Sequence, residues 1–291
     1  MKLVAACAVL VVAGTAGAKP HHKKKPSVAT NDATADGPKK VKHHNKGWPS
    51  PAAGPTESGD PELILTFDDG PNLKTTPSVL DTLAKHHIHA TFFLVGEMAQ
   101  NPKAAPLIDR MLREGHIIAN HTMTHQDLCR KDAERSARDI DDGKAAIEKA
   151  APHWTTVWFR TPYGVRCEQV DQLLEARHLT HFHWDLDPQE WKHNNTQKEI
   201  DYAEKQIGKM TGRNVLLMHD VKKATVEALP VILDWLEAEN AQRKLDHKRQ
   251  IRIIQGYELA TARLPTGLVD WMADATPDPV VWGTALANAL P

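Results

Sequence analysis

From residue 62 onward, short apolar runs alternate with amphipathic segments of helical length. Seven runs have the length and the β-branched or aromatic content of buried strands: LILTF (63–67), ATFFLV (90–95), HIIAN (116–120), TVWFR (156–160), THFHWDL (180–186), NVLLMH (214–219) and IRIIQG (251–256). Six segments between them carry apolar residues at helical spacing: 75–87, 105–115, 132–151, 168–177, 198–210 and 223–239. This alternation predicts parallel strands joined by crossover helices. Seven strands favour a distorted βα barrel, although the periodicity is also compatible with an open sheet.

The N-terminal segment has a different pattern, typical of a secretory signal peptide. Lys2 precedes an apolar run, Leu3–Val12, and the small residues Ala16-Gly17-Ala18 follow it. The run is shorter than the ~20 helical residues that cross a bilayer. We therefore expect residues 1–18 to be cleaved and the mature protein to be exported, into the periplasm or the medium, without a membrane anchor.

Residues 19–60 are rich in Lys, His, Pro, Ala and Gly and contain few aliphatic residues. Such a segment buries too little apolar surface to offset its ordering entropy, so we expect a disordered basic linker. It serves as a solvated spacer, as a contact to an anionic cell surface, or as a metal-capturing segment through its His pairs. The catalytic domain is expected at 61–262, and the tail at 263–291 shows no clear period.

Composition narrows the class of protein. The 291 residues are 41% hydrophobic, enough for a large core, and the net charge of -1 gives no argument for a nucleic-acid partner. After cleavage two cysteines remain, Cys129 and Cys167. An even number in an oxidising compartment permits one disulfide. The alternative is a pair of unpaired, half-buried thiols.

Candidate chemistry follows the predicted strands at the point where each ends, the position where βα folds carry their active sites. Asp68 and Asp69 end the first strand, and adjacent strand residues point to opposite faces. Gly70-Pro71 allows the backbone to turn so that both carboxylates serve one site. Two close carboxylates suggest a shared proton or a metal ion. An exposed turn is the simpler alternative.

Histidines and further charged residues follow the later strands. His121 and His125 come after the third strand, and two imidazoles with one carboxylate form a ligand set of catalytic zinc. A His-x-x-x-His pair also arises by chance in a chain with 17 histidines. The remaining polar residues at strand ends are Arg160 after the fourth strand, Asp185, Asp187, Glu190 and Trp191 after the fifth, and His219 at the end of the sixth.

Five motifs, TFDDGP, HTMTH, RTPYG, DPQEW and LLMH, occur in this order. Together they resemble the polysaccharide deacetylases, the NodB-homology enzymes of carbohydrate esterase family four, over residues 61 to 260. The resemblance implies a distorted seven-stranded βα barrel. It also implies a metal-dependent N-deacetylase acting on an extracytoplasmic polymer that contains N-acetylglucosamine, such as peptidoglycan or a chitin-like chain.

The resemblance also implies a role for each site residue. Asp69, His121 and His125 would bind one divalent metal ion, which we expect to be Zn²⁺ in preference to Co²⁺ or Ni²⁺. Asp68 would be the general base that takes a proton from the metal-bound water, and His219 the general acid. The remaining assignments are Arg160 as the residue that orients Asp68, the backbone N–H of Tyr163 as an oxyanion donor, and Trp191 and Leu217 as walls of the acetyl pocket.

The fourth motif departs from the family pattern. The family usually has Asp-x-x-Asp-Trp, whereas this chain has Asp187-Pro188-Gln189-Glu190-Trp191. Either Glu190 pairs with His219 through its longer side chain, or Asp185 or Asp187 takes that role.

With the motifs placed, Cys129 and Cys167 fall on loops that leave neighbouring strands at the same rim, so we expect them to form a disulfide. We expect a monomer. Alternative functions are an acetylxylan-type O-acetyl esterase, an amide hydrolase acting on a small molecule, a non-haem iron oxygenase, which shares the two-His, one-carboxylate ligand set, and a non-catalytic wall-binding barrel. The free Asp68 and His219 argue against the oxygenase and against the wall-binding barrel.

Overall fold

The computed structural model describes residues 59–255. The predicted signal peptide, nearly all of the predicted linker and the C-terminal tail lie outside the described residues. Within the described part of the chain, no helix combines the length and the apolar composition that crossing a membrane requires.

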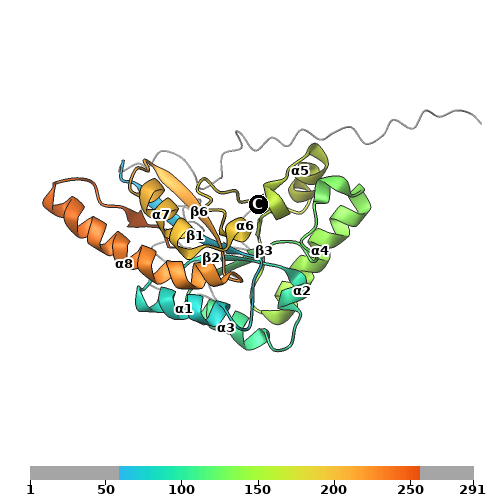
Figure 1. Ribbon diagram of the computed structural model, residues 1–291. Helices are drawn as coiled ribbons and strands as arrows, with labels where there is room; N and C mark the ends of the chain where they lie inside the picture. Colours follow the sequence, from blue (N-terminus) through green and yellow to red (C-terminus); the bar gives the residue numbers. More distant parts are fainter. Residues whose placement is uncertain (1–58, 256–291) are drawn as a thin grey trace, which may run out of the picture. The chain divides into compact units, whose positions relative to one another are not determined.

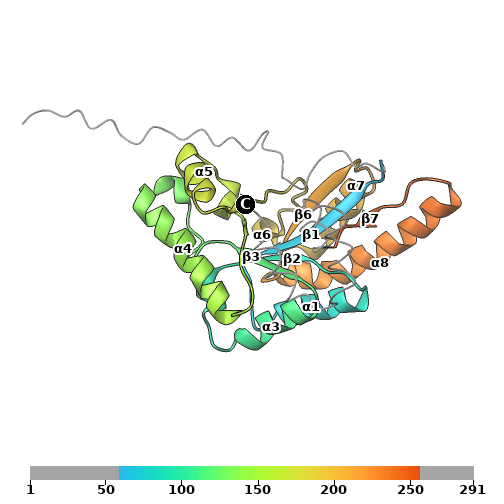
Figure 2. The ribbon, with the colours of Figure 1, turned by 180° about the vertical axis from the view of Figure 1, so that it is seen from behind.

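Seven parallel strands form one curled sheet, in the order β5-β4-β3-β2-β1-β6, with β7 paired to β1. Figures 1 and 2 show the sheet from opposite sides, with β1, β2, β3 and β6 labelled in both. The strands are β1 (Glu62–Asp68), β2 (Thr91–Leu94), β3 (Ile117–Asn120), β4 (Trp158–Phe159), β5 (Thr180–His181), β6 (Arg213–His219) and β7 (Arg252–Ile253). A parallel bridge between Leu186 and Leu216 brings the chain behind β5 against β6. The sheet therefore curls back towards itself, and the predicted distorted βα barrel is confirmed over an open sheet.

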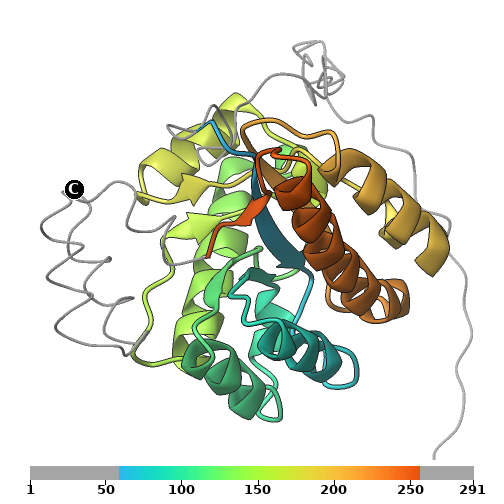
Figure 3. The ribbon, with the colours of Figure 1, turned by 90° about the vertical axis from the view of Figure 1, so that its left-hand side faces the viewer.

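All six predicted helices are present on the outside of this sheet (Figure 3). They are α1 (Thr76–Lys85), α3 (Ala105–Arg113), α4 (Ala133–Ala150), α5 (Glu168–Glu175), α7 (Thr196–Ile207) and α8 (Lys223–Leu245). Helix α8 continues to Leu245 instead of ending at residue 239. Four short elements have no helical period that the sequence could reveal: α2 (Gly96–Ala99), α6 (Glu190–His193) and the 3-10 turns η1 (Leu128–Arg130) and η2 (Pro162–Gly164).

The predicted run at 180–186 is not one strand. Thr180 and His181 pair with β4, and the chain then leaves that neighbour. Asp185 and Leu186 both donate their backbone N–H to Val215 O of β6, each at 3.0 Å. The same run thus contacts strands near both ends of the curled sheet, β4 through residues 180–181 and β6 through residues 185–186.

The core lies between the curled sheet and the surrounding helices. Every residue of β1 is buried, as expected for a parallel strand whose two faces are both covered. Phe67 stacks on Phe92 of β2, with ring centroids 5.0 Å apart. The buried strand β1 ends at Asp68, the first of the predicted site residues.

Two helices begin with side-chain caps: Asp132 accepts from the backbone N–H of Arg135 before α4, and Asn195 from that of Lys198 before α7.

Candidate active site

The predicted site residues gather at the carboxyl ends of four strands. Asp68 is the last residue of β1, His121 follows β3, Arg160 follows β4 and His219 is the last residue of β6. Strands β1 and β6 are neighbours, and Asp68 and His219 are partners in their register. The chain thus brings a carboxylate and an imidazole to the same level of the rim.

The turn after β1 points both adjacent carboxylates at His121. Asp69 has a φ of 74°, in the left-handed region, and the Gly70-Pro71 peptide is cis. An added Cβ at Gly70 would overlap the carboxylate of Asp220, so glycine is required there. As a result, Asp68 Oδ2 and Asp69 Oδ1 each lie 3.6 Å from His121 Nε2.

Asp69, His121 and His125 present three ligand atoms within 4.8 Å of one another. His121 Nδ1 lies 2.8 Å from the backbone oxygen of Arg160. Since a carbonyl only accepts, Nδ1 carries the hydrogen and Nε2 presents a lone pair. Burial lowers the pKa of His121 to about 3, against the opposing charge of Asp69, which keeps the ring neutral.

The geometry of Asp69, His121 and His125 is suited to binding a cation. Asp69 Oδ1 lies 3.1 Å from His125 Nε2, yet within the described residues this buried oxygen has no hydrogen-bond donor. Two imidazole nitrogens and one carboxylate oxygen therefore lie close enough together to bind one ion. A divalent metal ion satisfies such a set, and the donor types match zinc.

The loop that carries the two histidines is fixed by β3 and α4. Asn120 Oδ1 accepts from the backbone N–H of Thr122 at 2.9 Å, and its Nδ2 donates to Ile140 O of α4 at 2.9 Å. Thr124 donates through both its N–H and its hydroxyl to Asp139 of the same helix. The His121–His125 segment thus rests on a buried polar network that the motif pattern alone did not reveal.

Asp68 is held by a buried ion pair. The side chain of Arg160 is 0% exposed, and its Nη1 donates to Asp68 Oδ1 at 2.6 Å. Its Nη1 also lies 3.0 Å from Thr66 Oγ1, and its Nε donates to Phe182 O at 2.9 Å. The guanidinium covers the ring of Phe93 at 4.0 Å. One oxygen of Asp68 is therefore fixed, and the other lies 3.6 Å from His121 Nε2.

His219 pairs with Glu190, the residue that departs from the usual motif. His219 Nδ1 lies 2.6 Å from Glu190 Oε1, and Glu190 is completely buried. Asp185 instead accepts from Val215 N, and Asp187 from Gln189 N. Burial opposes protonation of His219, but the hydrogen bond and the charge of Glu190 outweigh it and raise its pKa to about 9.

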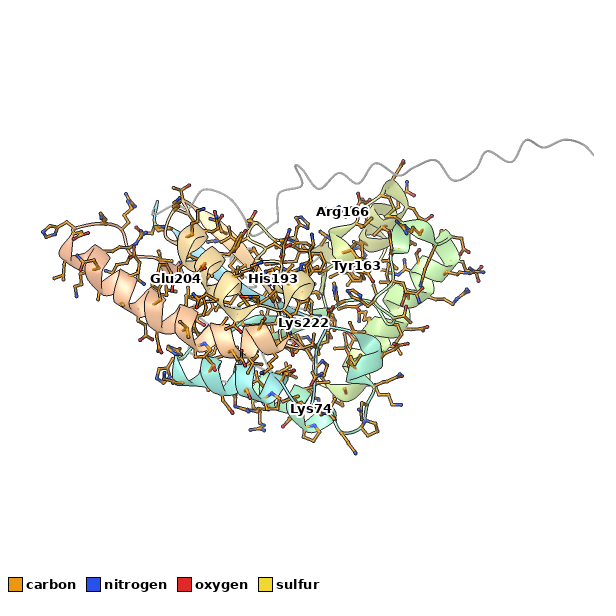
Figure 4. All side chains as sticks on the ribbon, in the orientation of Figure 1. Lys74, Tyr163, Arg166, His193, Glu204 and Lys222 are labelled. Atoms are coloured by element: carbon orange, nitrogen blue, oxygen red, sulfur yellow. A yellow bond between two sulfur atoms is a disulfide. The ribbon has the colours of Figure 1, made fainter. Side chains whose placement is uncertain are left out.

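The predicted substrate-binding residues lie around this centre. Tyr163 is 60% exposed and has a φ of 59°, and its ring and that of His125 are in T-shaped contact with centroids 4.8 Å apart. Tyr163, His193 and Lys222, labelled in Figure 4, belong to the segments that follow β4, β5 and β6. Trp191 is half exposed beside Glu190, and Leu217 is buried two residues before His219.

The two cysteines are joined in the structure. Cys129 in η1 and Cys167, the residue before α5, form a disulfide with a Cα–Cα distance of 6.0 Å. Their side chains pack against a second hydrophobic cluster. Its buried members are Leu128, Ile140, Phe159, Val170, Leu174 and Leu179. The bond therefore ties the loop after His125 to the segment after Tyr163.

The sequence reasoning missed several buried polar residues near the site. They are Thr66, Asn120, Asp139, Glu199, Asp220 and Thr225. A sequence signal existed for Asp220, which directly follows the His219 strand end, and for Asn120, which directly precedes the His motif. Glu199 and Thr225 sit inside helical patterns and gave no such signal.

A seven-stranded βα barrel with this rim defines a class of hydrolytic enzyme, and comparison with known proteins agrees. The polysaccharide deacetylase family model matches residues 56–182. A chitooligosaccharide deacetylase of Sinorhizobium fredii is 37% identical over 166 residues, which cover 56% of this chain and 74% of that protein. The peptidoglycan-N-acetylmuramic acid deacetylase PdaC of Bacillus subtilis is 34% identical over 189 residues, 64% of this chain and 38% of that protein.

Solved structures show the same fold. A family 4 carbohydrate esterase from Streptomyces lividans, solved in complex with acetate, aligns with a TM-score of 0.56 and 28% identity. The alignment covers 62% of this chain and 90% of that one. The chain belongs to the polysaccharide deacetylase family, and it is an enzyme of that hydrolase family.

Proposed function

We propose that this enzyme removes N-acetyl groups from an extracytoplasmic polysaccharide that contains N-acetylglucosamine. The observation that supports it most directly is the register of β1 and β6, which sets Asp68 opposite His219 at one rim, next to Asp69, His121 and His125. Relatives named chitooligosaccharide and peptidoglycan deacetylases support the same class of substrate.

Asp69, His121 and His125 would hold one divalent cation, with Zn²⁺ the ion that best suits two imidazoles and a carboxylate. When bound there, the ion supplies a Lewis acid that polarises the acetyl carbonyl and acidifies water. Among the described residues, no group donates a hydrogen bond to Asp69 Oδ1, which supports this assignment.

Asp68 acts as the general base. Its Oδ1 is occupied by Arg160, so Oδ2 is the oxygen that accepts the proton of the attacking water. The ion pair orients Asp68, and within the described residues Arg160 has no other carboxylate in hydrogen-bond contact.

His219 acts as the general acid. Glu190 holds its Nδ1, which leaves Nε2 to protonate the nitrogen as the carbon–nitrogen bond breaks and the amine departs. A pKa of about 9 keeps this ring protonated at neutral pH. The backbone N–H of Tyr163 stabilises the developing oxyanion, and Trp191 and Leu217 enclose the acetyl methyl group.

We propose that the protein is exported. Residues 1–18 act as a cleaved signal peptide, and the basic segment at 19–60 links the catalytic domain to an anionic surface or serves as a spacer. Mass spectrometry of exported material should show a mature chain that begins near Lys19. An intact N-terminus on exported protein would contradict this part of the proposal.

Acetate release from a panel of polymers tests the function. The panel contains chitooligosaccharides, peptidoglycan, poly-N-acetylglucosamine and acetylated xylan, each assayed with protein before chelation, after chelation, and after return of Zn²⁺. We expect acetate from an N-acetylated polymer, lost on chelation and restored by Zn²⁺. Acetate from xylan alone would show an O-acetyl esterase, and activity that survives complete metal removal would refute the metal assignment.

A further inference from the structure

Behind His219 lies a second buried carboxylic acid that the proposed mechanism does not use. Glu190 of α6 and Glu199 of α7 are both 0% exposed. Thr225 of α8 stands between them, with its Oγ1 3.0 Å from Glu199 Oε1 and 3.5 Å from Glu190 Oε1. Glu190 Oε1 in turn lies 2.6 Å from His219 Nδ1. Four side chains from three helices and one strand thus form one continuous series of polar atoms.

The number of protons in this series is limited. The hydroxyl of Thr225 carries one proton, so it can donate to only one of the two carboxyl groups. The second oxygens, Glu190 Oε2 and Glu199 Oε2, have no hydrogen-bond partner in the described part of the chain. Two ionised carboxylates in one buried site repel each other, and His219 offers a single positive charge, directly against Glu190. The arrangement is satisfied when Glu190 is ionised and Glu199 carries a proton.

We propose that protonated Glu199 is a positioning residue of this deacetylase: it donates to Thr225, Thr225 donates to Glu190, and Glu190 is thereby held against the catalytic His219. The inference rests on the proposed function, in which His219 is the general acid. Burial and then the charge of Glu190 raise the pKa of Glu199 to about 8, so it stays protonated at neutral pH.

This arrangement accounts for the departure in the fourth motif. Glu190 has one more rotatable bond than the aspartate usual in the motif, and a freely rotating carboxylate would lose its alignment with His219. Thr225 approaches the same oxygen, Oε1, that bonds His219. The donor series from Glu199 therefore restricts the extra torsion of the longer side chain.

The charged groups around His219 set the direction of the expected effect. In the described part of the chain, the ionisable side chains that interact electrostatically with His219 are the carboxyl groups of Asp68, Asp69, Asp187, Glu190, Glu199 and Asp220. Of these, Glu190 is the one with a hydrogen bond to the ring. Displacing Glu190 therefore removes the strongest contribution that opposes burial, and the pKa of His219 falls.

Thr225→Val tests the bridge, because valine has the shape of threonine without the hydroxyl. We expect kcat to fall about 3- to 10-fold, the effect of one lost hydrogen bond, with KM unchanged. The pKa of His219, followed by NMR of the ring in Zn²⁺-loaded protein without substrate, should fall by about half a unit to one unit. The NMR signal of the His219 ring is assigned as the one that is missing from the spectrum of His219→Gln. Thr225→Ser should restore both quantities.

Glu199→Gln and Glu199→Leu show whether residue 199 acts as a hydrogen-bond donor to Thr225. Glutamine still donates to Thr225 and cannot ionise, so its kcat should stay within about threefold of the parent, whereas leucine should lower kcat and the His219 pKa as Thr225→Val does. An equal loss in Glu199→Gln and Glu199→Leu would overturn the proposal, as would a lowered melting temperature with an unmoved His219 pKa in Thr225→Val. If the parent releases no acetate, the proposed function fails, yet the NMR comparison still decides the positioning role.

Discussion

Arg160 and Asp68 depend on each other at the level of single residues. Arg160 is the largest fully buried side chain among residues 59–255, and a guanidinium in that position needs a compensating charge. Asp68 supplies it through one oxygen, at 2.6 Å. The residue proposed as the general base therefore also contributes to the stability of the barrel, and its substitution has two effects.

Asp68→Asn should retain the metal and lose most turnover. Asparagine keeps an oxygen for Arg160 but cannot accept the proton, and loss of a general base typically lowers kcat by ~10²–10⁴-fold. Because the guanidinium loses its counter-charge, the melting temperature should fall as well. Acetate release, metal content and thermal unfolding measure the three effects.

Asp69→Asn is the matched control, since it neutralises the neighbouring carboxylate. It should lose metal together with activity, because Asp69 Oδ1 faces His121 and His125. If Asp68→Asn loses the metal and Asp69→Asn keeps it, the roles of the two carboxylates have been exchanged.

At this scale, sequence motifs predicted the residues at strand ends but not the residues that support them. Glu199 lies in an amphipathic helix, and a glutamate there is normally exposed because burial of an unpaired carboxylate is costly. Its burial depends on Thr225, 26 positions away in another helix. Asp69 and Tyr163 adopt left-handed backbone conformations that are uncommon for non-glycine residues, so only the folded loops reveal them.

Helix α4 is the element on which the histidine loop rests. Gly143 of α4 lies directly under that loop, and an added Cβ would come within 2.7 Å of both Asn120 Oδ1 and Met123 N. The helix and the loop can approach so closely only without a side chain at this position. The predicted helix was found from its period, but this contact required the packed structure.

Gly143→Ala should weaken metal binding and destabilise the fold. Overpacking costs typically ~1–3 kcal/mol, more than the gain of up to ~1 kcal/mol in helix propensity. Isothermal titration with Zn²⁺ and chemical unfolding measure the two effects. Asp142→Ala, on the exposed side of the same helix, is the matched control. A more stable Gly143→Ala protein with unchanged Zn²⁺ affinity would show that the contact is not restrictive.

The disulfide links η1 to the start of α5 across a sequence separation of 38. Replacing both cysteines, Cys129→Ser with Cys167→Ser, should lower the free energy of unfolding by at most ~3–4 kcal/mol in the chain-entropy model. Thermal unfolding with and without a reductant measures the effect. Reduction should lower the melting temperature of the parent and leave the double variant unaffected. Two titratable thiols in native, unreduced parent would refute the bond.

Strand positions were predictable at the element scale, but strand lengths were not. In the run at 156–160, Thr156, Trp158, Phe159 and Arg160 are all buried, although only Trp158 and Phe159 pair in the sheet. Burial and pairing separate because the sheet curls and its outer strands turn early into the rim loops. That curvature is a property of the whole curled sheet, which a local sequence pattern does not contain.

For the whole molecule, the site joins segments that are distant in sequence around the central strand. β1 pairs with β6 and with β2, and its last residues meet the loop after β3 through Asp69, His121 and His125. Within the described residues, no hydrogen bond joins the side chains of Asp69, His121 and His125. A metal ion bound by all three would therefore connect the loop after β1 to the loop after β3. Its binding should therefore stabilise the catalytic domain as a whole.

Metal removal should lower the melting temperature of the parent. A ligand at 100 times its Kd stabilises the folded state by about 2.7 kcal/mol, which corresponds to about 5–10 °C for a domain of this size. Thermal unfolding is compared within each protein, with Zn²⁺ and with chelator, so that baseline differences between variants cancel. His121→Ala lacks a metal ligand, so its melting temperature should be the same with Zn²⁺ and with chelator. His178→Ala replaces an exposed histidine that is distant in sequence from the proposed ligands, so it should respond to the chelator as the parent does. A parent whose melting temperature ignores the chelator, or a His121→Ala protein that responds as the parent does, would place the stabilising ion elsewhere.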